Sequence, residues 1–159
     1  YVELSLSTMA RVNAISHLRW EQIDFENRVI EDVLEKEQRY VTLYFSEKVK
    51  DLLLQLKEYR ETNNINDYGW LWYTPYVNEK KCVSNSTLAS WTKRVSDMVD
   101  IPLHCHTWRK SASNLLKKKG MPLEDISTLL NHLDTSTTKK HYINSQDSNI
   151  SALKDKYNI

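Results

Sequence analysis

The sequence predicts an α+β domain, a mainly helical bundle with a small antiparallel β-sheet. Only two glycines and three prolines occur in 159 residues, which favours long elements over Gly-rich loops. Most segments repeat apolar residues at helical spacing. One pair of segments, 28–34 and 39–45, is instead rich in β-branched and aromatic residues, as strands are. The length is typical of one domain.

The first sixty residues are predicted to form a short helix, a hairpin and a longer helix. Apolar residues recur three apart in 11–18, as one face of a helix requires. The polar residues between the two strand-like segments suit a turn, and Lys36 would lie at or near its tip. Ser46 is a plausible N-cap for an amphipathic helix that runs to about Arg60.

The rest of the chain is predicted to be helical apart from one loop and one short strand. Gly120 suits the position just past a helix end, and Pro122 suits the first turn of the next helix. In order, we expect a polar loop at 62–67, a short buried strand at 70–73, helices at 86–99 and 107–119, a helix from 122 to about 130, and short helices at 135–142 and 148–156.

Composition excludes several broad classes of protein. Hydrophobic residues make up 40% and charged residues 27%, so wholesale disorder is excluded. No apolar run reaches the roughly 18 residues that span a bilayer. Cys82 and Cys105 are too few for a disulfide scaffold, and free thiols in a reducing compartment fit best. We therefore expect a cytoplasmic protein that has no membrane partner.

The net charge of +1 conceals a strong asymmetry along the chain. Residues 21–79 hold thirteen acidic and seven basic side chains, whereas residues 80–119 hold nine basic and two acidic ones. The basic stretch has two readings, a set of solvated helix faces or a surface that faces phosphates. Composition leaves both readings open.

His106 and Arg109 are the first residues that suggest chemistry. Three residues apart at a predicted helix start, they lie on one face of the first turn. An arginine offers a fork that stays charged and binds two oxygens at once, and a histidine can move a proton near neutral pH. Such a pair could hold a phosphate.

Further residues surround this pair in a characteristic order. Arg11 opens a helix that is followed by Leu18-Arg19-Trp20 and by Ile23-Asp24, and Lys36 lies on the hairpin. Downstream of Arg109 come Leu129-Leu130-Asn131-His132 and then Thr137-Thr138-Lys139-Lys140-His141-Tyr142. In this order and spacing, nearly the whole chain resembles the catalytic domain of the tyrosine recombinases, the phage integrase family.

The resemblance implies a role for each of these residues. Arg11 and Arg109 would clamp the scissile phosphate, and His132 would donate a further hydrogen bond to it. Tyr142 would attack phosphorus and leave a 3′-phosphotyrosyl link and a free 5′-hydroxyl. Lys36 would be the general acid that protonates the leaving oxygen. His106 would be an acid/base partner of the Tyr142 hydroxyl, which makes six expected catalytic residues in all. Neither ATP nor a metal cofactor would be required, because the covalent link conserves the phosphodiester energy.

The resemblance also implies a partner and an assembly. The partner would be double-stranded DNA, cut and rejoined at a specific site for integration or excision of a phage or other mobile element. The active assembly would be a homo-tetramer on DNA, held together by exchange of C-terminal segments. Residues 1–159 would form a single catalytic domain, a fragment from which the family's N-terminal DNA-binding domain is absent.

Three positions depart from the family pattern, and several alternatives stay open. Ala14 stands where the family commonly has Glu, Asn131 replaces a Gly, and Lys110 replaces a His. Lys36 also suits a merely solvated turn between two acidic neighbours. The alternative functions are a type IB topoisomerase, a non-catalytic DNA-binding relic of the same fold, and a metal-binding module built on 104–106 with His132.

Overall fold

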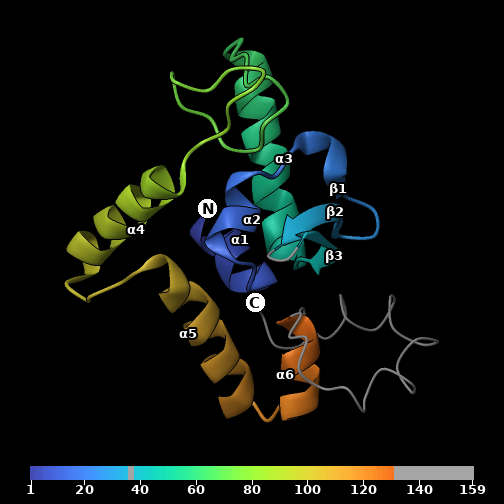
Figure 1. Ribbon diagram of the computed structural model, residues 1–159, viewed down its shortest axis with the longest axis vertical. Coiled ribbons are helices and arrows are strands. Elements are labelled where there is room, and N and C mark those ends of the chain that lie inside the picture. Colours follow the sequence, from blue (N-terminus) through green and yellow to red (C-terminus); the bar gives the residue numbers. More distant parts are fainter. Residues whose placement is uncertain (36–37, 131–159) are drawn as a thin grey trace.

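The computed structural model describes residues 1–35 and 38–130, which form a small antiparallel sheet with helices around it (Figure 1). The elements are α1 (Val2–Thr8), α2 (Val12–Ser16), the 3-10 helix η1 (Trp20–Gln22), β1 (Ile23–Asp24), β2 (Val29–Glu35), β3 (Arg39–Tyr44), α3 (Glu47–Thr62), α4 (Asn85–Val99), α5 (Cys105–Lys118) and α6 (Leu123–Leu129). The predicted α+β class is confirmed. No helix within this described part of the chain is long and apolar enough to cross a membrane.

The sheet consists of the predicted hairpin with one short strand added at its edge. Its order is β1-β2-β3, with both pairs antiparallel. The β2–β3 register shifts between Ile30 and Val33, where Asp32 has a positive φ of 51°. The side-chain amide of Gln22 donates to the carbonyls of Glu31 and Asp32 at 3.2 and 2.9 Å. This β-bulge turns the end of β2, so that Val33 and Glu35 are both buried.

The long helices lie close to their predicted bounds. Ser46 is the residue before α3, as expected, and its backbone N–H donates to the Ser7 hydroxyl at 3.0 Å, which ties α3 to α1. α4 begins after Ser84, whose hydroxyl accepts the N–H of Thr87 at 3.1 Å. Gly120 follows α5 with a φ of 87°, the left-handed conformation that its position predicted.

The strand predicted at 70–73 is wrong. Trp70 forms an isolated bridge with Arg19, and the segment joins no strand of the described sheet. Instead, the Leu71 N–H donates to the Leu18 carbonyl at 2.8 Å, and the Trp72 indole N–H donates to the Ile15 carbonyl at 2.7 Å. These bonds, to α2 and to the residue two positions after it, satisfy backbone and indole groups of a buried segment that joins no strand ladder. The helices predicted at 135–142 and 148–156 lie outside the described residues.

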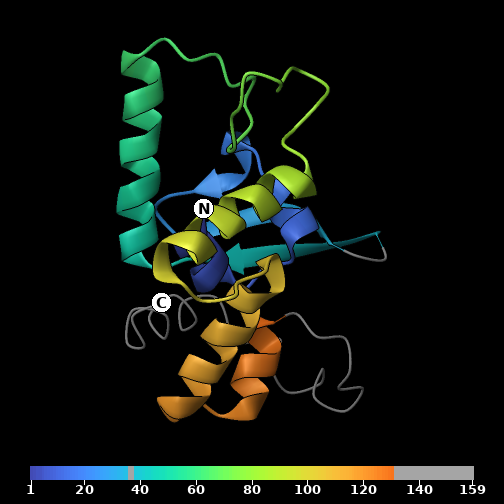
Figure 2. The ribbon, with the colours of Figure 1, turned by 90° about the vertical axis from the view of Figure 1, so that its left-hand side faces the viewer.

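Two groups of buried side chains make up the core. The larger one joins the sheet to α1, α2, α3 and α4. The smaller one joins Met9, at the end of α1, to α5 and α6, which lie side by side at the lower end of the molecule in Figure 2; its members are Met9, Ala112, Leu116, Met121, Ile126, Leu129 and Leu130. Met9 is fully buried and has a left-handed backbone, φ 53°. The chain thus turns sharply inside this contact, two residues before Arg11.

We predict that Leu116→Ala destabilises the domain by about 2–5 kcal/mol, the usual result of a cavity in a close-packed core. Leu116 is fully buried on α5, whereas its neighbour Leu115 is 42% exposed. Leu115→Ala is the matched control and should stay within about 0.5 kcal/mol of the parent. Urea unfolding followed by tryptophan fluorescence measures both. Equal losses in the two variants would mean that α5 is not held through Leu116.

Candidate active site

Arg11 lies at the junction of α1 and α2 and is held by a buried carboxylate. It is the residue before α2, with an extended backbone (φ −72°, ψ 148°). Its Nη1 donates to Oε2 of Glu35, the last residue of β2. The Arg11 side chain is 35% exposed and the Glu35 side chain 1%. The Arg11 guanidinium is therefore held by a buried carboxylate, while part of the Arg11 side chain remains exposed to solvent.

Arg109 reaches across the molecule from the second turn of α5. Its Nη1 donates to the Met9 carbonyl and its Nη2 to the Leu130 carbonyl, both at 2.5 Å. Met9 directly follows α1, two residues before Arg11, and Leu130 directly follows α6. The half-buried guanidinium of Arg109 thus joins α5 to two other segments of the chain. In the sequence, these segments come just before the predicted catalytic positions 11 and 132.

The two guanidinium groups lie close enough to influence each other's charge. Burial lowers the pKa of Arg109, the positive charge of Arg11 lowers it further, and the Glu35 carboxylate opposes both effects. The ordinary pKa of an arginine lies so far above neutral pH that the side chain stays charged there. The site therefore brings together two cations and one anion and has a net positive charge, as binding of a phosphate requires.

His106 lies one turn before Arg109 on the same face of α5, and its side chain is exposed. α5 begins at Cys105, two residues earlier than predicted. The Thr107 N–H donates to the His104 carbonyl at 2.7 Å, and the Thr107 hydroxyl accepts the N–H of His104 at 2.9 Å, so these bonds close the first turn before Thr107. Among residues 1–35 and 38–130, no group of three or more His, Cys, Asp or Glu side chains is arranged to hold a metal ion.

The structure thus brings together two of the six predicted catalytic residues, Arg11 and Arg109, and places His106 on the same face of α5 as Arg109. Lys36, His132 and Tyr142 lie outside the described residues, so their roles stay predictions.

The three departures from the family pattern fall in different surroundings. Ala14 is buried in the larger core group, and Lys110 is exposed on α5. Asn131 lies outside the described residues. A charged group at the buried position of Ala14 would cost free energy without a partner.

Glu35 is the site residue that sequence analysis missed, because it was assigned to the polar turn. Along β2 the side chains of Val33 and Glu35 are buried, with the exposed Leu34 between them. Continuing the period-two alternation of the strand past Val33 would have placed Glu35 inward. The signal was present, but a charged residue normally ends such a pattern.

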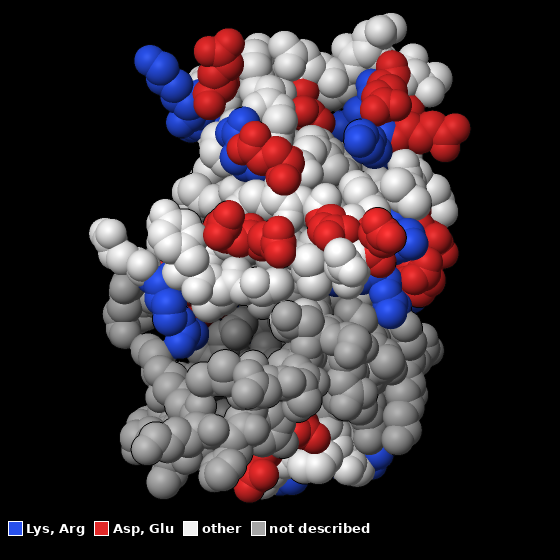
Figure 3. All heavy atoms as spheres, turned by 90° about the vertical axis from the view of Figure 1, so that its right-hand side faces the viewer, with Lys and Arg blue, Asp and Glu red and all other residues white. Residues whose placement is uncertain are grey.

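Charge on the surface is divided between different elements. On the face drawn in Figure 3, acidic side chains are spread across the middle. Glu21, Glu26, Glu31 and Asp32, which lie in or beside the sheet strands, are exposed. The exposed basic residues of the stretch 80–119 lie on α4 and α5 and in the segment before α4. Some of these are simple solvated pairs, since Lys93 on α4 binds Asp97 at 2.9 Å.

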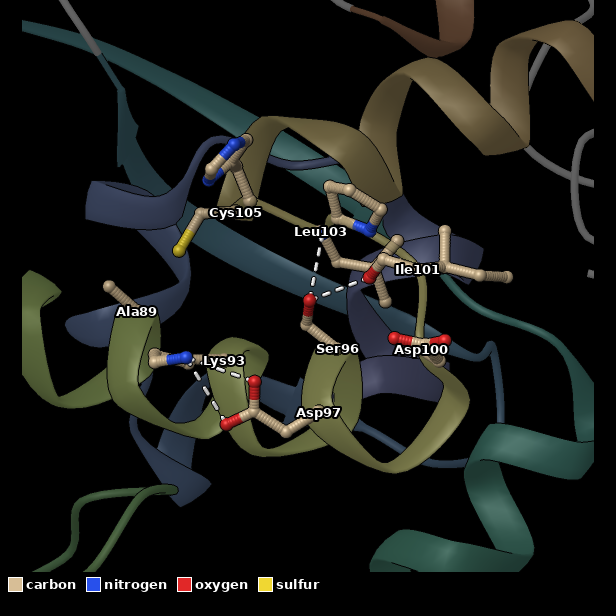
Figure 4. Close-up of a pocket in the computed structure, with 10 residues that line it drawn as sticks. Ala89, Lys93, Ser96, Asp97, Asp100, Ile101, Leu103 and Cys105 are labelled. Atoms are coloured by element: carbon tan, nitrogen blue, oxygen red, sulfur yellow. Dashed lines mark hydrogen bonds and ion pairs between the residues drawn. The ribbon is translucent and has the colours of Figure 1, made fainter.

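A hollow of about 520 Å³ lies between α4 and the start of α5 (Figure 4). Its polar groups bind one another: Lys93 pairs with Asp97, and the Ser96 hydroxyl donates to the Ile101 carbonyl at 2.6 Å and accepts the Leu103 N–H at 3.1 Å. Neither guanidinium of the arginine pair lines it. This hollow is therefore separate from the candidate active site.

Comparison with known proteins agrees with this fold and site. The model of the phage integrase family matches residues 1–149. The chain is 26% identical over 162 residues to the protein named "Probable integrase/recombinase" of Acholeplasma phage L2, covering 99% of this chain and 52% of that protein. The crystal structure of XerA recombinase superposes with a TM-score of 0.70 at 16% identity, covering 96% of this chain and 54% of that one. The site-specific recombinase XerH bound to its difH substrate superposes with a TM-score of 0.66 at 18% identity, over 83% and 38% of the two chains.

This chain thus has the fold of the tyrosine recombinases, a helical domain with a three-stranded sheet. Two arginines converge within it. The chain belongs to the phage integrase family. It spans about half the length of the integrase/recombinase relative and of the XerA chain that it matches.

We predict that Arg109→Ala loosens the attachment of α6 to the rest of the domain. The change removes both carbonyl contacts and should lower the free energy of unfolding by about 2–3 kcal/mol, the range for hydrogen bonds from a charged group. Backbone amides of α6 should exchange faster with solvent, as hydrogen exchange detected by mass spectrometry can measure.

The control for this prediction is Lys110→Ala, which removes an exposed cation from the next position of α5. It should leave stability within about 0.5 kcal/mol of the parent. Unchanged exchange of α6 in Arg109→Ala would show that the two carbonyl contacts do not hold this helix.

Proposed function

We propose that this protein is a site-specific recombinase that cuts and rejoins DNA strands through a covalent 3′-phosphotyrosyl intermediate. The observation that carries the proposal is the convergence of Arg11 and Arg109, from opposite ends of the described chain, in a member of the phage integrase family. The similar fold of XerH, a recombinase bound to its DNA substrate, supports duplex DNA as the partner.

The two arginines suit the charge changes of phosphoryl transfer. A phosphodiester carries one negative charge, and its non-bridging oxygens gain more as the pentavalent transition state forms. Fixed cations aimed at those oxygens stabilise the transition state more than the ground state. Arg11 and Arg109 are each held by acceptors of the protein, which fixes their guanidinium groups before DNA binds.

The remaining three expected residues, with His106, complete the first chemical step. The Tyr142 oxygen forms a bond to phosphorus as the bond from phosphorus to the 5′ oxygen breaks. The phenolic proton passes to His106, and Lys36 supplies a proton to the departing 5′ oxygen. His132 donates a hydrogen bond to a non-bridging oxygen. Assistance is needed because a phenol with a pKa of about 10 is a weak nucleophile at neutral pH.

The second step reverses the first with a different strand. A 5′-hydroxyl from another strand attacks the phosphotyrosine, a new phosphodiester forms, and Tyr142 leaves with its proton restored. No external energy is needed, because one phosphodiester replaces another. Exchange between two duplexes requires four active sites, which supports a homo-tetramer on DNA. We place the reaction in the integration or excision of a phage or other mobile element, because the integrase/recombinase relative is a phage protein.

We predict that the full-length protein forms a covalent adduct with a nicked duplex, and that Tyr142→Phe abolishes it without changing DNA affinity. The nick lets the short strand downstream of the cut dissociate, so the phosphotyrosine accumulates. Duplexes that tile the DNA on either side of the coding sequence provide the substrates. Denaturing gels detect the adduct, and gel shifts measure affinity.

The matched control for this test is Tyr76→Phe, which removes the hydroxyl of an 83%-exposed tyrosine and should leave adduct formation unchanged. An adduct that persists in Tyr142→Phe would assign the nucleophile elsewhere. Binding with a steep salt dependence but no adduct in the parent would favour a DNA-binding relic. Relaxation of supercoiled plasmid without site preference would favour a type IB topoisomerase.

We predict that Arg11→Lys slows adduct formation by about 10²- to 10³-fold, the usual effect of removing one donor to a developing oxyanion. Lysine retains a cation beside Glu35 but not the planar fork that binds two oxygens. The rate is measured at saturating DNA, with the melting temperature as a check on folding. Arg94→Lys, an exposed arginine of α4, is the control. A rate equal to that of the parent would remove Arg11 from the phosphate clamp.

A further inference from the structure

We infer that Glu35 is a positioning residue for Arg11, which it holds by one edge so that the opposite edge is presented to the scissile phosphate. The inference rests on the proposed function, since it concerns the phosphate clamp of that reaction. Glu35 would act through Arg11 and not on the DNA itself, because its side chain is almost completely buried.

The geometry of the contact leaves most of the guanidinium available. Glu35 accepts from Nη1 of Arg11, so the edge formed by Nε and Nη2 is not used by this contact. That edge is the planar fork that binds two oxygens of one phosphate. Because Arg11 is partly exposed and Glu35 is buried, a phosphate from solvent would reach Arg11 without first displacing Glu35.

Among the described residues, Glu35 is the hydrogen-bond and ion-pair partner of the Arg11 side chain. Arg11 precedes α2 and has an extended backbone, so no preceding helical turn restricts its side chain. It is also repelled by the nearby charge of Arg109, whereas the Glu35 carboxylate attracts both arginines. Arg109 is anchored differently, by two neutral carbonyls that leave its charge undiminished. Glu35 therefore supplies both an anchor and a counter-charge for the pair.

The second carboxylate oxygen indicates that Glu35 depends on Arg11 as much as Arg11 depends on Glu35. Glu35 Oε1 is buried and has no hydrogen-bond partner among the described residues. Among the described residues, Arg11 is thus the hydrogen-bond partner of this buried anion, and loss of either residue leaves the other without that bond. The two residues should behave as one unit, and their substitutions should be strongly non-additive.

The test compares Glu35→Ala and Glu35→Gln with the parent in the full-length protein. At saturating nicked duplex, Glu35→Ala should form the covalent adduct about 10- to 100-fold more slowly, as expected when a catalytic group is misplaced. The dissociation constant for duplex DNA should change by less than about threefold, because many phosphate contacts contribute to it. Glu35→Gln retains an acceptor oxygen, so its rate of adduct formation should lie between the rates of the parent and of Glu35→Ala. Glu31→Ala removes an exposed carboxylate from the same strand and should match the parent.

Thermal melting of Arg11→Ala, Glu35→Ala and the double variant tests the pair without DNA. The double variant should melt no lower than the less stable single variant. Additive losses would overturn the inference whether or not the protein cuts DNA. An unchanged adduct rate in Glu35→Ala would also overturn the inference. Parallel losses of adduct rate, DNA affinity and folded protein would overturn it too, because they indicate a purely structural role. Failure of the parent to form any adduct would instead refute the proposed function.

Discussion

The hydrogen bonds that Arg109 donates to the carbonyls of Met9 and Leu130 are the contact on which the site depends. α5 and α6 have their own small group of buried side chains, which includes Met9 and packs against Leu6 of α1. The guanidinium of Arg109 adds directional bonds to that apolar contact. A residue that the proposed chemistry uses is therefore also a structural tie, and its two functions cannot be separated by a single truncation.

The two arginines are held by acceptors of different charge. Neutral carbonyls orient Arg109 and leave its full charge for a phosphate, whereas the carboxylate of Glu35 orients Arg11 and offsets part of its charge. A DNA-free site with two uncompensated guanidinium groups side by side would be repulsive. One carboxylate relieves that repulsion and still leaves a net positive site. This balance explains why a buried acid is compatible with a site that is proposed to bind a polyanion.

Positive and negative side chains are also unevenly distributed over the surface of the protein. Acidic side chains are spread across the middle of the face drawn in Figure 3, and the exposed basic residues of the stretch 80–119 lie on α4, α5 and the segment before α4. A whole-chain charge of +1 therefore describes neither region. For a domain proposed to bind DNA on one side, the local field matters more than the total.

The sequence by itself determined the hairpin, the long helices and the identity of the charged residues, because apolar periodicity, capping residues and motif order are local properties of a chain. It failed at 70–73, where buried residues bond to α2 and to the residue two positions after it, not to a strand, and at Glu35, whose charge argued for solvent. Only the tertiary structure decided these points, and only it brought Arg11 and Arg109 together across almost one hundred positions of sequence. The physical reason is that hydrogen bonds and ion pairs between distant segments leave no periodicity in the chain, so their partners are defined only when the core has packed.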